Sequence, residues 1–238
     1  MSEEVTPAQH FQPYIKPLEI GLPARFFYAT DEARQWYDPI KPHARLEYEW
    51  VLANVPLRDQ RVIDCGAHHG HYAVVLGAAM RGTGTLCVAD ALATNCAIIE
   101  ANLAINRIGV AIHCCAVTNR RGIVRFLGES NGRVVDYNGV EVPGKRLVDL
   151  LDSPTVVKVD IEGEEFKVIP DSIDELPTVH SWIVEVHPSI NRVAPQLMQA
   201  FQDRPFDLHW VNREAGCIEP YPADARWTTH TTVFARRK

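Results

Sequence analysis

The stretch VIDCGAHHGHY, residues 62–72, decides the fold. The apolar residues before Asp64 predict a short buried strand, and the apolar residues after Gly70 predict a helix directly behind it. Gly66 and Gly70 flank the turn between them, where glycine permits unusual backbone angles and lets a ligand approach the backbone closely. The pattern is D-x-G-x-x-x-G rather than the G-x-G-x-x-G of dinucleotide enzymes, so a pyrophosphate ligand is not favoured.

The same alternation of strand and helix continues along the chain and predicts an α/β fold, with a mostly parallel sheet covered by helices on both faces. A helix over 43–55 leads into the first strand. Further strands are predicted over 84–90, 110–117, 155–163 (with its turn), 181–188, 206–212 and 229–237, and further helices over 93–106, 145–152 and 191–203. Residues 118–145 hold two short, glycine-punctuated alternating segments, IVRFLG and RVVDY, which predict an inserted hairpin.

Six prolines between residues 1 and 42 predict an irregular N-terminal arm or cap with at most short helices. Residues 43–238 show no linker and no repeat, so we expect one catalytic domain there. With 238 residues, 46% hydrophobic and 23% charged, the chain has enough apolar side chains for a packed core.

Charge and hydropathy narrow the choice of partners. The net charge is −6 and basic residues gather only at Arg120 with Arg121 and at 236–238, which disfavours nucleic acid as a partner. No apolar stretch is long enough to span a bilayer, and the acidic N-terminus lacks the pattern of a secretory signal, so we expect a cytoplasmic protein. The six cysteines form no C-x-x-C pair and are expected to be reduced thiols.

Polar residues close four of the predicted parallel strands. These are Asp64, Asp90, Asp160 with Glu162, and Glu185 with His187. In an open α/β sheet, ligands bind beyond the carboxyl ends of the strands, so we expect these side chains at one rim. Asp90 lies 20 residues after Gly70, a spacing that suits an acid binding the hydroxyls of a ribose. The two signals together predict an adenosine-containing cofactor.

Four segments, in this order, resemble the FkbM-type methyltransferases: VIDCGAHHGHY, DALATNCAIIEANLAIN, VVKVDIEGEE and IVEVHP. The resemblance spans roughly residues 45–190. It implies the class I methyltransferase (Rossmann-like) fold, a three-layer sandwich with a mostly parallel seven-stranded sheet whose last strand is antiparallel. It also implies S-adenosylmethionine as cofactor and O-methylation of a hydroxyl on a sugar or natural product.

The chain departs from the family pattern at two points. His68 stands where members usually have asparagine, and Asp90-Ala91-Leu92-Ala93 replaces a Glu-Pro pair followed by a second proline. Aspartate keeps a ribose contact, whereas loss of the prolines changes the loop beside the adenine pocket. The residues expected to bind the cofactor are Asp64, Gly66, Ala67, His68, Gly70, Tyr72, Asp90, Ala91, Asn95, Ala116, Val117 and Asp160.

The expected catalytic residues are His187, Asp160 and Glu162. An acceptor hydroxyl must lose its proton, and His187 is the first candidate for the base because the ordinary pKa of histidine lies near neutrality. Asp160 is the second candidate. Alternatively, the three residues hold a divalent cation such as Mg²⁺ that acidifies the hydroxyl, and the sequence leaves this choice open.

Other polar and aromatic residues have simpler structural interpretations. His68, His69 and His71 lie too close together on one turn to converge easily on an ion, so no metal is predicted there. Glu164 with Glu165 is typical of a solvated helix start, and Lys158 of a strand residue with its ammonium at the surface. The aromatic residues expected to pack in the core or cap are Trp36, Tyr37, Tyr48 and Trp50, of which Trp36 or Tyr37 could also cover the substrate.

Three other functions compete with a small-molecule O-methyltransferase. The first is a nicotinamide-dependent oxidoreductase, which is disfavoured because the third glycine of the G-x-G-x-x-G pattern is missing. The second is an RNA ribose 2′-O-methyltransferase using Lys158, Asp160 and Glu185, which is disfavoured because the chain has an acidic composition. The third is a scaffold that binds the cofactor without catalysis. The acceptor and the oligomeric state do not follow from the sequence.

Overall fold

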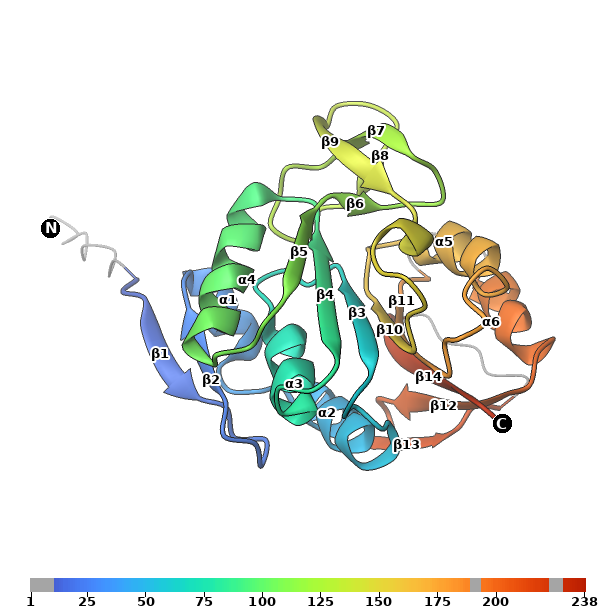
Figure 1. Cartoon of the computed structure of the whole chain (residues 1–238), viewed down its shortest axis with the longest axis horizontal. Coiled ribbons are helices and arrows are strands. Elements are labelled where there is room, and N and C mark those ends of the chain that lie inside the picture. The colour runs from blue at the N-terminus through green and yellow to red at the C-terminus, as the bar shows by residue number, and fades with distance from the viewer. Residues whose placement is uncertain (1–10, 189–193, 223–228) are drawn as a thin grey trace, which may run out of the picture.

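An eight-stranded sheet forms the centre of the computed structural model, which describes residues 11–188, 194–222 and 229–238 (Figure 1). In pairing order the strands are β13 (Cys217–Pro220), β12 (Phe206–Asn212), β14 (Thr231–Arg237), β11 (Ser181–Val186), β10 (Val156–Val159), β3 (Arg61–Cys65), β4 (Thr85–Asp90) and β5 (Ala111–Cys114). The five strands from β11 to β5 are parallel. The last strand, β14, is antiparallel to both of its neighbours, as expected.

The sheet has one strand more than the seven that the sequence predicts. The additional strand is β13, which pairs with β12 across a tight turn that ends at Gly216. Gly216 adopts a positive φ of 66° and donates its N–H to the carbonyl oxygen of Asn212. Because β13 is a four-residue edge strand with little apolar alternation, its sequence carries no strand signal.

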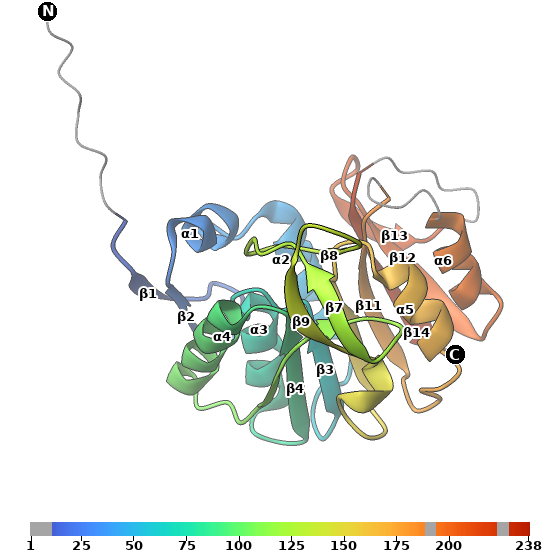
Figure 2. The ribbon, with the colours of Figure 1, turned by 90° about the horizontal axis from the view of Figure 1, so that it is seen from above.

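Helices cover both faces of the sheet, which gives the expected three layers (Figure 2). One core contains side chains of α2 (Pro42–Asn54), α3 (His71–Met80) and α4 (Ala93–Ile105). The other contains side chains of the 3₁₀ turn η1 (Leu147–Asp149), α5 (Glu165–Ser172) and α6 (Ala194–Gln202). Successive residues of β3 point to opposite faces, so Val62 joins the first core and Ile63 the second.

One predicted helix differs in extent: the helix expected over 145–152 is only the single turn η1. The helix expected over 191–203 is observed as α6 over Ala194–Gln202, and residues 191–193 lie outside the described residues. No helix within the described ranges is both long and apolar enough to cross a membrane.

The N-terminal segment contains more regular structure than an irregular arm. Strands β1 (Tyr14–Pro17) and β2 (Arg25–Tyr28) pair in an antiparallel sheet, and α1 (Asp31–Tyr37) follows. Phe26 and Tyr28 are buried in the core beside α3 and α4. Asn102 of α4 hydrogen-bonds both the N–H and the carbonyl of Phe27. These long-range contacts stabilise the strands, and a proline count cannot reveal them.

The insertion forms a separate four-stranded sheet beyond the ends of β4 and β5 (Figure 1). Its strands are β6 (Ala116–Val117), β7 (Gly122–Phe126), β8 (Val134–Val135) and β9 (Val140–Lys145), paired in the order β6-β9-β7-β8. The expected hairpin is the β7–β8 pair, to which β9 and β6 add two strands. The strand predicted over 110–117 therefore divides at Cys115, where the chain leaves the main sheet.

Candidate functional site

A cavity of about 580 Å³ lies at the carboxyl ends of β3, β4, β10 and β11. This volume is within the range of about 300 to 1,000 Å³ that is usual for small-molecule sites. Residues of α1, α2, β14 and the loop between β7 and β8 complete its wall. The cavity thus occupies the rim where the strand-ending polar residues were expected.

Most of the residues expected to bind the cofactor line this cavity. They are Gly66, Ala67, His68, Tyr72, Asp90, Ala91, Ala116, Val117 and Asp160. Asp64, Gly70 and Asn95 lie behind the wall: Asp64 is fully buried beside Lys158, Gly70 packs against Ile99, and Asn95 hydrogen-bonds Asp90. All three expected catalytic residues, His187, Asp160 and Glu162, line the cavity.

Asp90 is held by three donors from its own neighbourhood. Its Oδ1 accepts hydrogen bonds from the N–H of Leu92 and from Asn95 Nδ2, both at 3.0 Å, and its Oδ2 accepts one from the N–H of His68 at 2.8 Å. Burial raises the pKa of Asp90 to about 6, against the opposing effect of these donors. Since each carboxylate oxygen can accept two hydrogen bonds, Oδ2 keeps one acceptor position for a ligand.

Gly66 is required by the fold itself. A Cβ at this position would lie 1.6 Å from the carbonyl oxygen of Asp160, because the backbone that follows β3 lies directly against the backbone that follows its parallel neighbour β10. Its φ of +71° also belongs to the left-handed region that favours glycine. The sequence suggested that this glycine lets a ligand approach the backbone. In the structure it allows a neighbouring segment of the chain's own backbone to approach.

Lys158 is buried, contrary to the simple interpretation of an exposed strand residue. It lies opposite Asp64 in the β10–β3 register, and its Nζ is 3.4 Å from Asp64 Oδ1 and 3.2 Å from Asp160 Oδ2. Burial opposes its charge, but these carboxylates prevail and raise the pKa of Lys158. Lys158 therefore remains protonated and compensates the charges of the buried Asp64 and the half-buried Asp160.

Glu165 is fully buried and Glu164 is also buried, so the interpretation of this pair as a solvated helix start is wrong. The Oε1 of Glu165 accepts hydrogen bonds from the N–H and the Nδ1 of His187, at 2.9 and 3.1 Å, and its Oε2 accepts the N–H of Gly163 at 2.7 Å. Glu165 thereby fixes the orientation of the His187 ring. The sequence places an acid at this helix start but gives no sign that it would reach His187.

The other ring nitrogen of His187 faces two carboxylates. Nε2 is 3.8 Å from Asp160 Oδ1 and 3.6 Å from Glu162 Oε2. Burial opposes protonation of His187, but the hydrogen bond to Glu165 and the neighbouring negative charges raise its pKa to about 10. His187 therefore does not have, in the folded protein, the near-neutral pKa for which it was the first candidate for the base.

Glu185 joins the same group of side chains. Asp160, Glu185 and His187 each offer one ligand atom, and these atoms lie within 4.8 Å of one another. Arg213 Nη2 lies 3.6 Å from Glu185 Oε1 on the other side. Glu32, His68 and His69 form a second group at comparable spacing, whereas the buried His71 shares a hydrogen bond with the Tyr48 hydroxyl through Nδ1.

His68 connects three parts of the cavity wall. Its Nδ1 shares a hydrogen bond of 2.8 Å with the Tyr37 hydroxyl of α1, and its Nε2 shares one of 2.6 Å with Ser130 Oγ in the β7–β8 loop. Its ring stacks on Trp36 with centroids 4.9 Å apart. Both aromatic residues of α1 also line the cavity, in line with the suggestion that they cover a substrate.

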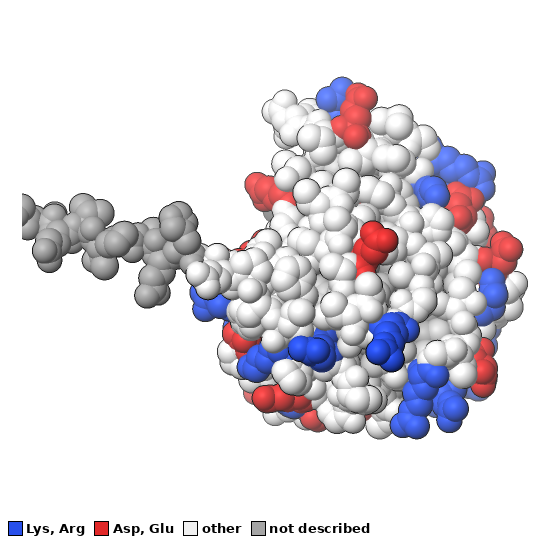
Figure 3. All heavy atoms as spheres, turned by 60° about the vertical axis from the view of Figure 1, so that its left-hand side comes forward, with Lys and Arg blue, Asp and Glu red and all other residues white. Residues whose placement is uncertain are grey.

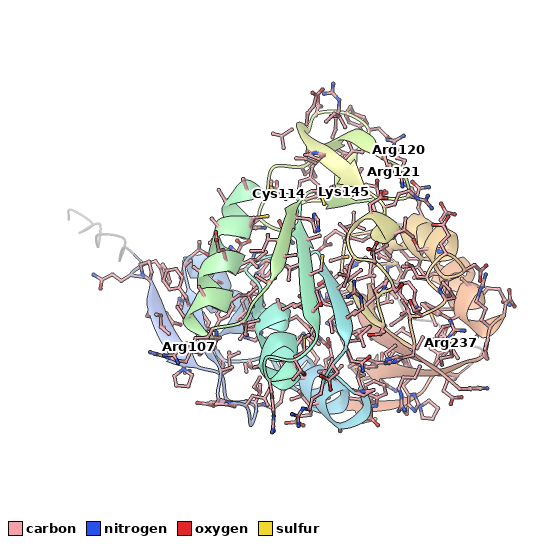
Figure 4. The ribbon with its side chains drawn as sticks, viewed as in Figure 1. Arg107, Cys114, Arg120, Arg121, Lys145 and Arg237 are labelled. Atoms are coloured by element: carbon pink, nitrogen blue, oxygen red, sulfur yellow. The ribbon has the colours of Figure 1, made fainter. Side chains whose placement is uncertain are left out.

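The basic clusters of the sequence lie on different parts of the surface. Figure 4 shows Arg120 and Arg121 beside the second sheet and Arg237 at the far end of the main sheet. Arg121 is moreover paired with Asp149. Uncharged residues occupy most of the centre of the face shown in Figure 3. These clusters therefore do not combine into one basic surface.

Solved structures share this fold at low sequence identity. A methyltransferase FkbM structure from Methylobacillus flagellatus KT is 16% identical with a TM-score of 0.53, over 84% of this chain and 49% of that one. A putative rRNA methylase from Clostridium thermocellum is 8% identical with a TM-score of 0.54, over 84% and 98%. A 16S rRNA methyltransferase from T. thermophilus, in complex with AdoMet and guanosine, is 10% identical with a TM-score of 0.51, over 95% and 50%.

The chain spans about half the length of the FkbM structure that it resembles. No curated protein sequence matches it significantly. The model of the methyltransferase FkbM domain matches residues 64–210, which include the cavity-lining ends of β4, β10 and β11. The chain belongs to the FkbM methyltransferase domain family.

Proposed function

We propose that the chain is an S-adenosylmethionine-dependent methyltransferase that methylates a hydroxyl group of a small molecule, such as a sugar or natural product. The observation that carries this proposal is that two different groups of residues line the cavity, which we call its two halves. One half, around Asp90 and Ala91, has the acid and the apolar wall that suit an adenosine, and the other presents His187 with its neighbouring acids. A hydroxyl acceptor needs such proton-accepting groups, because it must lose its proton during transfer.

The first half fits S-adenosylmethionine. Asp90 Oδ2 has an acceptor position for a ribose hydroxyl, and Ala91, Ala116 and Val117 form an apolar surface for the base. The buried hydroxyl of Tyr72 has no hydrogen-bond partner among the described residues, and it lines the same cavity. Such a group is stabilised by a polar ligand. When bound, the cofactor supplies a methyl group on a sulfonium, which is already a good leaving group.

The second half would bind and deprotonate the acceptor. His187, Asp160 and Glu162 face this half, and we assign acceptance of the hydroxyl proton to them as a group. Trp36 and Tyr37 exclude water from the same region, which favours alignment of the acceptor with the methyl group. Lys158 has a raised pKa and contacts two acids, so it does not suit the role of a base in ribose methylation of RNA.

A thermal-shift measurement tests the cofactor. S-adenosylhomocysteine at 100 times its Kd should stabilise the fold by about 2.7 kcal/mol, or roughly 5 to 10 °C in Tm. NADH should give no shift. The reverse result would support the oxidoreductase. Transfer of labelled methyl from S-adenosylmethionine to hydroxylated sugars, macrolides or short RNAs then identifies the acceptor class, and label on RNA alone would refute a small-molecule acceptor.

His187→Ala tests the second half of the cavity. We expect kcat to fall by about 10²- to 10⁴-fold with little change in cofactor affinity. His209→Ala is the matched control, because His209 lies on β12 and does not line the cavity. If His187→Ala and His209→Ala have equal turnover, His187 is a structural residue and the assignment is wrong.

A further inference from the structure

We infer that Asp160, Glu185 and His187 form a binding site for a hard divalent cation, Mg²⁺ or Mn²⁺, in the acceptor half of the cavity. The two carboxylates supply the oxygen ligands that these ions prefer, and the imidazole adds one nitrogen ligand. The three ligand atoms lie within 4.8 Å of one another. Two ligands held about 2.0 to 2.2 Å from one ion can be at most about 4.4 Å apart, so small side-chain rotations bring all three atoms onto one ion.

The contacts of His187 support this site independently of the acids. His187 is only 7% exposed and lines the cavity, yet its Nε2 makes no hydrogen bond within the described part of the chain. The 3.8 Å between Nε2 and Asp160 Oδ1 is too long for a hydrogen bond and suits two ligands of one ion. Nε2 thus faces two carboxylates from beyond hydrogen-bond distance, at a point where a cation would contact the ring and both acids.

Glu165 gives His187 the tautomer that a ligand needs. When Nδ1 donates its hydrogen to Glu165 Oε1, the neutral ring carries its lone pair on Nε2, and a cation bound there takes the place of the second ring proton. Histidines that bind metals almost always donate their other N–H to a carboxylate or a carbonyl, which fixes the ring and raises its basicity. Glu165 is itself fully buried and held by the N–H of Gly163, so it positions His187 rigidly.

The local charges leave room for a cation. Lys158 contacts Asp160 through Oδ2, on the side away from His187, and it also compensates Asp64. Glu162 adds a further carboxylate 3.6 Å from His187 Nε2. The positive charge of Lys158 is thus shared between two acids, while Asp160 Oδ1 and the Glu162 carboxylate both face the imidazole of His187. A divalent ion at this point compensates more negative charge than a single proton does.

The role of the ion rests on the proposed function, whereas the site itself does not. An acceptor oxygen bound at the ion would lose its proton to Glu162. That oxygen would then form the new bond to the methyl carbon as the carbon–sulfur bond of the cofactor breaks, leaving the neutral thioether. This gives Glu162 the part of proton acceptor and His187 the part of ligand.

Binding of Mn²⁺ to the full-length, EDTA-treated protein tests the site without cofactor or acceptor. Electron paramagnetic resonance of free Mn²⁺ should show one bound ion, displaced by excess Mg²⁺. Glu185→Gln should weaken binding at least about 10-fold, while Glu32→Gln, in the second group of potential ligands, should leave it unchanged. The bound ion should show nitrogen coupling from an imidazole, which His187→Gln removes while the protein keeps its Tm.

Three results would overturn the inference: no Mn²⁺ binding at millimolar concentration, loss of binding in Glu32→Gln but not in Glu185→Gln, or nitrogen coupling that persists in His187→Gln. Methyl transfer at full rate in EDTA would overturn the catalytic role and leave the proposed function standing. Specific Mn²⁺ binding in a protein that does not bind S-adenosylhomocysteine would support the site and refute the proposed function instead.

Discussion

Gly66 and Gly82 have nearly the same backbone angle but different surroundings. Their φ values are +71° and +74°. A Cβ at Gly66 would meet the carbonyl oxygen of Asp160 at 1.6 Å, whereas a Cβ at Gly82 has no neighbour within 4 Å among the described residues. The pair therefore separates the effect of backbone angle from the effect of the close approach between β3 and β10.

We predict that Gly66→Ala destabilises the protein by more than about 4 kcal/mol, which is roughly 10 °C or more in Tm, or prevents folding. Gly82→Ala should cost only about 1 to 2 kcal/mol, the penalty for a left-handed residue with a Cβ. Urea and thermal unfolding of the two variants provide the measurement. Equal losses in both variants would show that the approach at Gly66 is not as close as the structure indicates.

Asp90 offers a second test at the scale of one residue. Asp90→Ala removes one hydrogen bond that a ribose hydroxyl would donate to a charged acceptor, so the Kd of S-adenosylhomocysteine should rise by roughly 10- to 150-fold, or about 1.5 to 3 kcal/mol. Asn95→Ala is the comparison, because it also loses a hydrogen bond to Asp90 but keeps the carboxylate. Calorimetry that finds the same affinity in Asp90→Ala as in the wild type would place the ribose elsewhere.

At the scale of elements, His68 joins α1 and the β7–β8 loop to the turn after β3. His68 itself has a positive φ of 52°, a conformation that asparagine also adopts readily. Asparagine, the usual residue of the family at this point, is too short to reach both Tyr37 and Ser130. The longer side chain of this protein therefore holds two separate wall segments against the cavity.

Hydrogen exchange can measure this connection. Tyr37→Phe should speed exchange in α1, and Ser130→Ala should speed exchange in residues 127–133, each by roughly 2- to 13-fold, as expected for loss of one hydrogen bond. His68→Asn should affect both segments. His69→Asn is the control, since His69 Nδ1 has no hydrogen-bond partner in the described residues. Unchanged exchange in both segments of His68→Asn would contradict a joining role.

At the scale of the whole molecule, buried neutral histidines set the response to acid. Burial lowers the pKa of His71 to about 3 and the pKa of His68 and His69 to about 4. Between these values and about 6.5, the unfolded chain binds protons that the folded chain does not. Each of these histidines should therefore lower the free energy of unfolding as the pH is lowered through this window, by up to about 1.4 kcal/mol per pH unit, while Asp90, whose pKa is raised to about 6, contributes in the opposite direction.

We predict that His71→Phe reduces this slope by one proton while keeping the stacking on Tyr37. At neutral pH the variant should be less stable by about 1 to 3 kcal/mol, because the Tyr48 hydroxyl loses its partner. Urea unfolding at several pH values between roughly 4.5 and 7.5, which covers the upper part of the window and the range above it, gives the slopes. Tyr48→Phe is the control: it loses the same hydrogen bond but should keep the full slope. Equal slopes in His71→Phe and the wild type would refute the assignment.

The sequence alone determined the features that depend on neighbouring residues. Short apolar runs that end in Asp64, Asp90 or Asp160 predict parallel strands, and the carboxyl ends of such strands must share one rim. For this reason the class of fold and the rim at which most of the expected site residues lie followed from periodicity and spacing, and the family followed from four motifs in order. Local patterns contain this information because strand and helix periods repeat within a few residues.

The tertiary structure alone decided which side chains meet at that rim. Glu165 and His187 are 22 residues apart, and their contact depends on how α5 packs against the end of β11. Burial beside two acids keeps Lys158 charged, and the negative groups around His187 raise its pKa. The wall formed by α1 and the β7–β8 loop likewise depends on the position of His68. Burial and distant charges change the chemistry of a residue, and both are properties of the packed chain that no local pattern of residues contains.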